Sequence, residues 1–169
     1  MKKITIISAT LENNYKLAEN IKSILMEMNI EVSLISLEDH MLPLYTDKIF
    51  SQLKESCHKE VVYLTHEMKT ADAVIICGPE YNGSITPIIS NALAWISTST
   101  ESWRDCFLDK IALIGTHSGG NGDKFFRAMK MQLEHLGSVV MPRSISVNNS
   151  SPLKKDSTKK ILKQLINLI

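Results

Sequence analysis

Three short polar segments of the chain combine residue types suited to holding a small ligand. The first loop, residues 8–14 (SATLENN), places hydroxyl and amide side chains between an apolar run and an amphipathic one. If a helix begins here, its free N–H groups and its dipole favour a phosphate. The alternative is that Ser8, Thr10 and Asn13 only cap the helix, because these residue types are favoured at helix starts without a ligand.

The second loop, residues 78–87 (GPEYNGSITP), is a dense cluster of turn-forming residues. Its backbone donors and acceptors would suit the polar edge of a flat heterocycle, with Tyr81 against the ring. The alternative is a tight connection in which Asn82 and Gly83 only supply positive φ. The third loop, residues 116–122 (THSGGNG), is polar and rich in glycine, and its histidine could contact a ligand or be purely structural.

Other chemical signatures are missing from the sequence. Neither the G-x-G-x-x-G fingerprint of dinucleotide-binding proteins nor the G-x-x-x-x-G-K-[ST] loop of nucleoside triphosphatases is present. A mononucleotide is still compatible with the sequence as a ligand. We identify no metal-ligand spacing and no Ser/His/Asp or Cys/His set, so no metal site and no catalytic side chain are expected. Cys57, Cys77 and Cys106 form no C-x-x-C pair and receive no redox role, and they favour a reducing, cytoplasmic location.

The bulk composition indicates one ordinary globular domain over residues 1–169. Hydrophobic residues make up 44% and charged residues 22% of the chain, and the formal net charge is +1. No large field of one sign favours nucleic acid or an anionic membrane. No apolar stretch is long enough to suggest a membrane span, and no signal peptide is recognised. A small-molecule partner is therefore expected.

Apolar runs that alternate with amphipathic segments would position these loops. The expected strands are residues 3–8, 31–37, 73–77, 110–115 and 139–147, the last interrupted by Pro142. The expected helices are residues 14–28, 50–70, 86–98, 123–136 and 154–169. This alternation predicts a three-layer α/β sandwich around a five-stranded parallel sheet. Ligands bind at the carboxyl ends of such strands, so the three loops should converge on one crevice.

Residues 79–95, PEYNGSITPIISNALAW, resemble the P-E-Y-N-G-S-x-P-x-x-L-K-N-A-[IL]-[DE]-W signature of NADPH-dependent FMN reductases. Residues 41–47 (MLPLYTD) are similar to that family's L-P-x-Y-x-x-D loop, and Asn14-x-x-Leu17-Ala18 is similar to its N-x-x-L-A. The resemblance implies a flavodoxin-like fold with strand order 2-1-3-4-5. It also implies bound FMN, NADPH or NADH as electron donor, and a homodimer or homotetramer.

The resemblance further implies which residues bind the cofactor. The FMN phosphate would face Ser8, Thr10, Asn13 and Asn14, and the ring would lie against Pro79, Glu80, Tyr81, Asn82, Gly83 and Ser84. The small residues Ser118, Gly119 and Gly120 would let the chain approach the ring. The first loop departs from the family's G-S-x-R-x-x-S-x-N, being one residue shorter with Leu11 where arginine is expected. Losing this charge-assisted contact predicts weakly held FMN.

The expected activity is electron transfer from NAD(P)H through FMN to a small acceptor, which would be a flavin, a quinone, an azo compound or a metal ion. The flavin would carry the chemistry, which explains why no side-chain nucleophile is needed. One alternative is a flavodoxin-type electron carrier, although such carriers are usually strongly acidic and this chain is balanced. Another is a non-enzymatic FMN-binding or sensor protein.

Overall fold

The computed structural model describes residues 1–53 and 58–169 of the chain. Its strands form a parallel sheet with the order β2-β1-β3-β4-β5, and β6 also pairs with β4. The strands are β1 (Lys3–Ser8), β2 (Glu31–Ser36), β3 (Ala73–Cys77), β4 (Ile111–His117), β5 (Val139–Val140) and β6 (Ile145–Val147). The expected last strand is thus split into β5 and β6 on either side of Pro142, which has no N–H to donate to a ladder.

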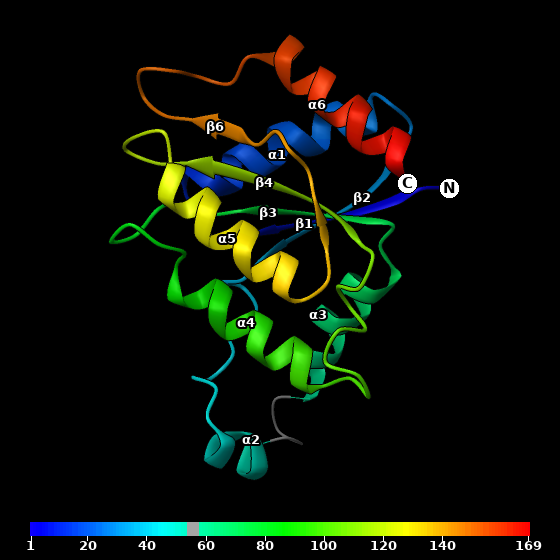
Figure 1. Cartoon of the computed structure of the whole chain (residues 1–169), viewed down its shortest axis with the longest axis vertical. Coiled ribbons are helices and arrows are strands. Elements are labelled where there is room, and N and C mark those ends of the chain that lie inside the picture. The colour runs from blue at the N-terminus through cyan, green and yellow to red at the C-terminus, as the bar shows by residue number, and fades with distance from the viewer. Residues whose placement is uncertain (54–57) are drawn as a thin grey trace.

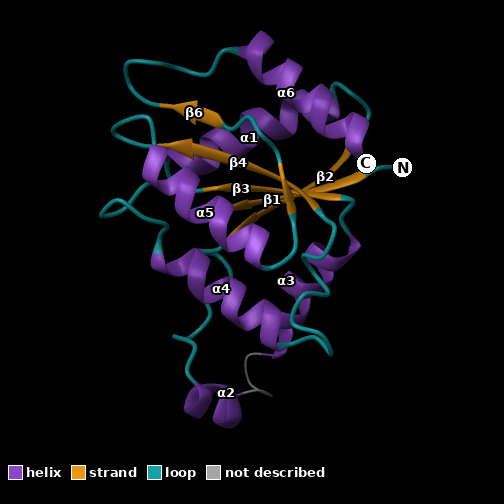
Figure 2. Ribbon diagram, viewed as in Figure 1, coloured by secondary structure: helices purple, strands orange, loops and turns teal. Residues whose placement is uncertain are grey.

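Helices cover both faces of this sheet (Figures 1 and 2). They are α1 (Asn13–Met26), α2 (Asp47–Leu53), α3 (His58–Thr70), α4 (Pro87–Thr98), α5 (Asp123–His135) and α6 (Lys155–Leu168). The expected helix over residues 50–70 corresponds to α2 and α3, and residues 54–57, including Cys57, lie outside the described part of the chain. None of the described helices is long and apolar enough to cross a membrane.

Alternating strand residues supply two apolar layers, which is why the sheet needs helices on both sides. Ile6 and Ile75 point to the cluster that contains the inner faces of α1 and α6. Ile7 and Ile76 point to the opposite cluster, with α3, α4 and α5. Each fully buried aliphatic side chain contributes about 1.5–3 kcal/mol to folding. The three-layer sandwich and the strand order 2-1-3-4-5 are therefore confirmed.

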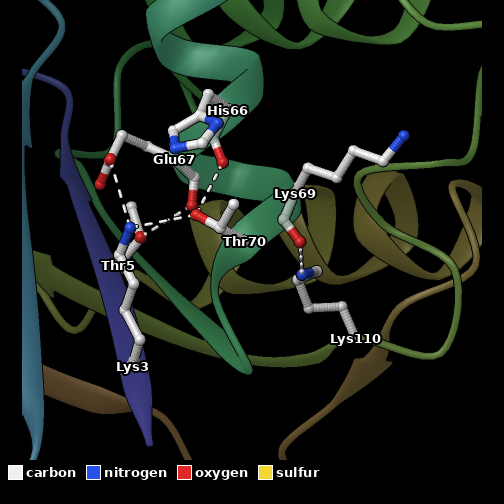
Figure 3. Close-up of polar contacts among 7 residues, drawn as sticks. All are labelled: Lys3, Thr5, His66, Glu67, Lys69, Thr70 and Lys110. Atoms are coloured by element: carbon white, nitrogen blue, oxygen red, sulfur yellow. Dashed lines mark hydrogen bonds and ion pairs between the residues drawn. The ribbon is translucent and has the colours of Figure 1, made fainter. Parts of the chain in front are cut away.

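Polar contacts attach α3 to the sheet at the amino ends of β1 and β4 (Figure 3). Thr5 donates its hydroxyl to the carbonyl of Glu67 at 3.0 Å, and Lys3 Nζ lies 3.2 Å from Glu67 Oε1. Lys110 Nζ donates to the carbonyl of Lys69 at 3.3 Å, and burial lowers the pKa of Lys110. These contacts fix the amino end of the sheet, while the three polar loops lie at the opposite, carboxyl end.

Candidate functional site

Hydrogen bonds between strand ends bring the three loops together. The amide of Ala9 donates to Cys77 O at 2.8 Å, and the amide of Gly78 donates to Gly115 O at 3.2 Å. The chain therefore leaves β1, β3 and β4 side by side at the end where the arrowheads lie in Figure 1. A pocket of about 200 Å³ opens there, lined by Thr10, Glu12, Asn13, Asn14, Glu38, Pro79, Tyr81 and His117.

The second loop contains a two-residue turn at Asn82 and Gly83. Tyr81 and Ser84 exchange both backbone hydrogen bonds, at 3.1 and 2.9 Å, while Asn82 and Gly83 have φ of 50° and 70°. Positive φ at both central positions is the type I′ geometry that Asn-Gly favours. Within residues 1–53 and 58–169, the amides of Asn82 and Gly83 have no protein acceptor. The turn thus presents two free N–H donors beside Tyr81, whose side chain is half exposed.

A chain of hydrogen bonds joins the second loop to the third. Thr116 donates its hydroxyl to Gly78 O at 2.6 Å, and its oxygen lies 2.8 Å from Ser118 Oγ. Ser118 Oγ in turn accepts the amide of Glu80 at 2.8 Å. Ser118, predicted to approach the cofactor, therefore uses its side chain to connect the two loops. Thr116, which the sequence did not single out, is the central member of this network.

Glu80 stabilises the start of α5. Its Oε2 accepts the amides of Lys124 at 3.1 Å and Phe125 at 3.2 Å, in the first turn of that helix. The N-cap residue of α5 is Gly122, which has no side chain to supply a cap. Glu80 therefore provides the cap from another loop, with its negative charge at the positive end of the helix dipole. The structure gives its carboxylate a positioning role at a place where the sequence predicted cofactor contact.

Gly119 and Gly120 lie in open space on the third loop. A Cβ built at either residue would meet no other atom within 4 Å. Packing within the described chain therefore does not require glycine at these two positions. The space beside their backbone is open, and contact with a cofactor there stays a prediction.

The first loop divides the predicted phosphate residues into two groups. Asn14 is buried, and its side-chain amide pairs with the backbone of His117 through bonds of 2.9 and 2.7 Å. Ser8 is also buried and donates to Thr10 O at 2.8 Å. Asn14 and Ser8 therefore hold the loops in place. Thr10 and Asn13 line the pocket, where their side chains are accessible to a ligand.

The beginning of α1 supplies further donors. Glu12 is the N-cap residue but makes no side-chain capping bond. Its carbonyl accepts the amides of Tyr15 and Lys16, whereas the amides of Asn13 and Asn14 have no protein acceptor in the described residues. Free N–H groups at a helix start form a favourable environment for an anion.

A carboxylate from the end of β2 reaches the same loop. The amide of Leu11 donates to Glu38 Oε2 at 2.5 Å. Glu38 and Glu12 both line the pocket, and none of its lining residues is Lys or Arg. Sequence reasoning missed Glu38, because no local pattern indicates which loop a residue 27 positions from Leu11 will contact.

The segment over residues 41–47 packs on α4. Trp95 is buried and donates its indole N–H to Pro43 O at 2.8 Å, and its ring meets that of Tyr45 edge-on at 5.4 Å. Asn91 Oδ1 accepts the amide of Tyr45 at 2.7 Å. The asparagine and tryptophan of the signature segment 79–95 therefore hold this neighbouring segment in place.

The remaining reactive groups lie apart from the crevice or are inactive. Cys77 and Cys106 are buried, and burial raises the pKa of Cys77 to about 12 and also raises the pKa of Cys106. A thiol that stays protonated is a poor nucleophile. Within residues 1–53 and 58–169, no group of three His, Cys, Asp or Glu side chains could hold a metal ion.

Solved structures with the same fold include a flavoenzyme, a flavodoxin and an azoreductase. The flavoenzyme NAD(P)H:(acceptor) oxidoreductase of Paracoccus denitrificans matches with a TM-score of 0.76 and 22% identity, over 99% of this chain and 95% of that one. An archaeal flavodoxin matches with a TM-score of 0.66 and 14% identity, over 98% and 95% of the two chains. An azoreductase of Bacillus anthracis gives a TM-score of 0.66 and 13% identity, over 99% and 97%. At these identities the likeness shows the flavodoxin-like fold.

Sequence comparison identifies the family. A subunit of the NADH:(hydroxy)cinnamate reductase of Vibrio ruber is 30% identical over 89 residues, which are 51% of this chain and 43% of that protein. The chain thus spans less than half the length of this relative. The family model for NADPH-dependent FMN reductase matches residues 2–152, nearly the whole chain. This protein therefore belongs to the NADPH-dependent FMN reductase family.

Proposed function

We propose that this protein transfers electrons from NADH or NADPH, through FMN held at the carboxyl ends of β1, β3 and β4, to a small acceptor such as a flavin, quinone, azo compound or metal ion. Membership of the family supports an FMN-dependent NAD(P)H oxidoreductase, and the acceptor and the contact residues go beyond what the family indicates. The observation that carries it is the convergence of the first and second loops on one pocket, where Asn13 and Asn14, whose amides are free at the start of α1, lie opposite Pro79 and Tyr81 of the second loop.

The residues present fit a flavin mononucleotide. The turn at Asn82 and Gly83 offers two N–H donors for the polar edge of a ring, and Tyr81 offers a half-exposed aromatic face. Gly119 and Gly120 leave space for close approach. At the other end, the amides of Asn13 and Asn14 suit a phosphate. Pro79 lines the pocket, and Ser84 closes the turn, so both would shape the ring site.

FMN supplies the hydride and electron transfer chemistry when it is bound. The protein's own residues would bind and orient the flavin. Free amides at the second loop would stabilise negative charge at the polar edge of a bound ring, because fixed dipoles need no reorganisation. The hydrogen bonds through Thr116 and Ser118 keep these amides in place. No proton-transferring side chain is required for this role.

The acceptor is proposed to be small because the related reductases are named for small acceptors. The Paracoccus and Bacillus neighbours are described as an NAD(P)H:(acceptor) oxidoreductase and an azoreductase, and the Vibrio relative as a subunit of a reductase of (hydroxy)cinnamates. Small unsaturated acceptors are therefore the first to try. A protein-to-protein electron carrier is the second candidate, on the strength of the flavodoxin neighbour.

Association into a homodimer or homotetramer is also proposed, together with a cytoplasmic location. An apolar hollow of about 470 Å³ lies beside the second loop, lined by Ser84, Ile85, Ala128, Met131, Gln132 and His135. Met131 is 70% exposed there, which suits burial against another copy of the chain. Sedimentation equilibrium of the purified protein would measure the oligomeric state.

The experiment is to purify the protein without added cofactor, record its visible spectrum, and then add FMN, followed under anaerobic conditions by NADPH or NADH. Bound flavin that bleaches with either nicotinamide supports the proposal. Binding without bleaching favours a carrier that receives electrons from a protein. No binding of FMN, with no rise in melting temperature, contradicts a flavin-dependent role.

A further inference from the structure

We propose that Glu38 sets this protein's preference between phosphorylated and unphosphorylated flavins, because its carboxylate occupies the first-loop amide that a phosphate would otherwise use. The inference rests on the proposed flavin site and concerns only the phosphate end of it. The amide of Leu11 donates to Glu38 Oε2 at 2.5 Å, so a carboxylate of the protein already binds where the phosphate of the ligand would bind.

The register of the sheet explains why Glu38 is there. Ser8 of β1 is paired with Ser36 of β2, and the amide of Leu37 continues the ladder by donating to Ser8 O at 2.9 Å. The segments that follow β1 and β2 therefore run side by side. The amide of Glu38 donates to Ser36 Oγ at 3.2 Å, which holds the turn after β2. This turn directs the carboxylate of Glu38 to the first loop.

The charges around the pocket strengthen the effect. Glu12 and Glu38 both line it, and the position where an arginine is expected holds Leu11. Lys16 lines a neighbouring hollow, together with Asn13 and His117, but not this pocket. A phosphate monoester carries a charge of about −1.5 to −2 at neutral pH. It would therefore meet two carboxylates here and no cation among the lining residues.

Binding of FMN is weakened by this arrangement but not prevented. The amides of Asn13 and Asn14 still offer donors at the start of α1. To use the Leu11 amide as well, the phosphate must displace the carboxylate of Glu38, which is exposed and free to swing into solvent. Riboflavin has the same ring and no phosphate, so it avoids both the displacement and the repulsion. The change that a substitution of Glu38 causes in the ratio of FMN to riboflavin affinity isolates the contribution of Glu38.

The test is to compare the two flavins on full-length protein freed of cofactor, by quenching of flavin fluorescence. The variant Glu38→Gln removes the charge and keeps an oxygen that can accept the Leu11 amide. A unit charge a few ångströms from a phosphate in a solvent-exposed site changes affinity by about tenfold. We expect Glu38→Gln to bind FMN about tenfold more tightly and riboflavin with unchanged affinity.

Two further variants make the result specific. Asp39→Asn makes the same change of charge at the next residue, which is exposed and does not line the pocket, and it should leave FMN affinity unchanged. Glu12→Gln removes the other lining carboxylate, which receives no loop amide, and should tighten FMN by a smaller factor than Glu38→Gln. Melting curves of all variants check that the fold is retained.

Each outcome is decisive for one of the two proposals. The Glu38 inference is overturned if Glu38→Gln leaves FMN affinity unchanged or lowers it, if FMN and riboflavin change alike, or if Asp39→Asn has the same effect. If neither flavin binds the wild-type protein or any variant, the proposed function fails and this inference fails with it. Tighter FMN with unchanged riboflavin supports the inference.

Discussion

The two ends of the crevice are built differently. At the second and third loops, hydrogen bonds run from Gly78 through Thr116 and Ser118 to Glu80, and Glu80 continues to the start of α5. At the first loop, the amide of Leu11 meets one exposed carboxylate. The second and third loops, where we propose that the ring binds (the ring end), are therefore held by a network in which most members are buried. The first loop, where we propose that the phosphate binds (the phosphate end), is anchored by the buried Asn14 but carries exposed charges where the ligand would meet it.

This difference indicates how each end responds to change. Buried networks have large energetic consequences, because breaking one bond leaves other polar groups unsatisfied. Exposed charges contribute less and are screened by salt. Substitutions in the buried bonds, at the ring end and at Asn14, should therefore change the stability of the fold, while substitutions of the exposed charges at the phosphate end should change mainly which ligand binds.

The largest effect is expected from Gly122→Ala at the ring end. Gly122 has φ of 73°, and a Cβ there would lie 2.5 Å from Thr116 Cγ2. The left-handed conformation costs an alanine about 1–2 kcal/mol, and the overlap adds to it. We expect a loss of about 2–4 kcal/mol, seen as a fall of roughly 5–10 °C in melting temperature.

The matched control is Gly120→Ala on the same loop. A Cβ at Gly120 meets nothing within 4 Å, so its melting temperature should stay near that of the wild type. FMN affinity should nevertheless fall if the ring lies against this backbone. Equal destabilisation by the two alanine variants would contradict the finding that the third loop requires glycine at Gly122 and not at Gly120.

The next effect is expected at Asn14, the residue that links the first loop to the third. Asn14→Leu keeps a similar volume but leaves the N–H and C=O of His117 without their partners. Leaving two polar groups unpaired at a partly buried site costs about 2 kcal/mol. Urea unfolding should show this loss for Asn14→Leu and a change below about 0.5 kcal/mol for Asn13→Leu, at the exposed neighbour. Similar losses of stability in the two leucine variants would show that the bonds between Asn14 and His117 contribute little to the fold.

A smaller effect is expected from Glu80→Ala, which removes the cap of α5. Loss of a helix cap costs about 1 kcal/mol. Glu80→Gln should lose less, because its amide oxygen still accepts the helix N–H groups. Since Glu80 positions the ring end, both flavins should bind Glu80→Ala equally less tightly, in a fluorescence titration. A loss confined to FMN would instead place the phosphate near Glu80.

The strands and most helices could be predicted from sequence because apolar runs such as residues 73–77 have one stable location, between two layers of helices. The loops of the crevice could be predicted because strand ends in a parallel sheet open to one side. The roles of individual side chains could not be predicted from the sequence. Asn14 and Glu80 have residue types that suit a ligand and a cap equally, and only the geometry shows that the protein uses them itself. Glu38 depends on strand register, which its own neighbourhood does not encode.

The smallest predicted effect concerns salt at the phosphate end. Repulsion between the FMN phosphate and Glu12 and Glu38 is screened when the Debye length falls from about 10 Å at 0.1 M to about 3 Å at 1 M ionic strength. The ratio of FMN to riboflavin affinity should therefore rise about twofold to threefold over this range in sodium chloride. A loop that held phosphate through an arginine would show the opposite sign, because salt weakens attraction. Leu11→Arg places a guanidinium on the exposed first loop and should reverse the slope. If the wild-type ratio falls with salt, an attractive field surrounds the phosphate and the contrast between the two ends of the crevice does not hold.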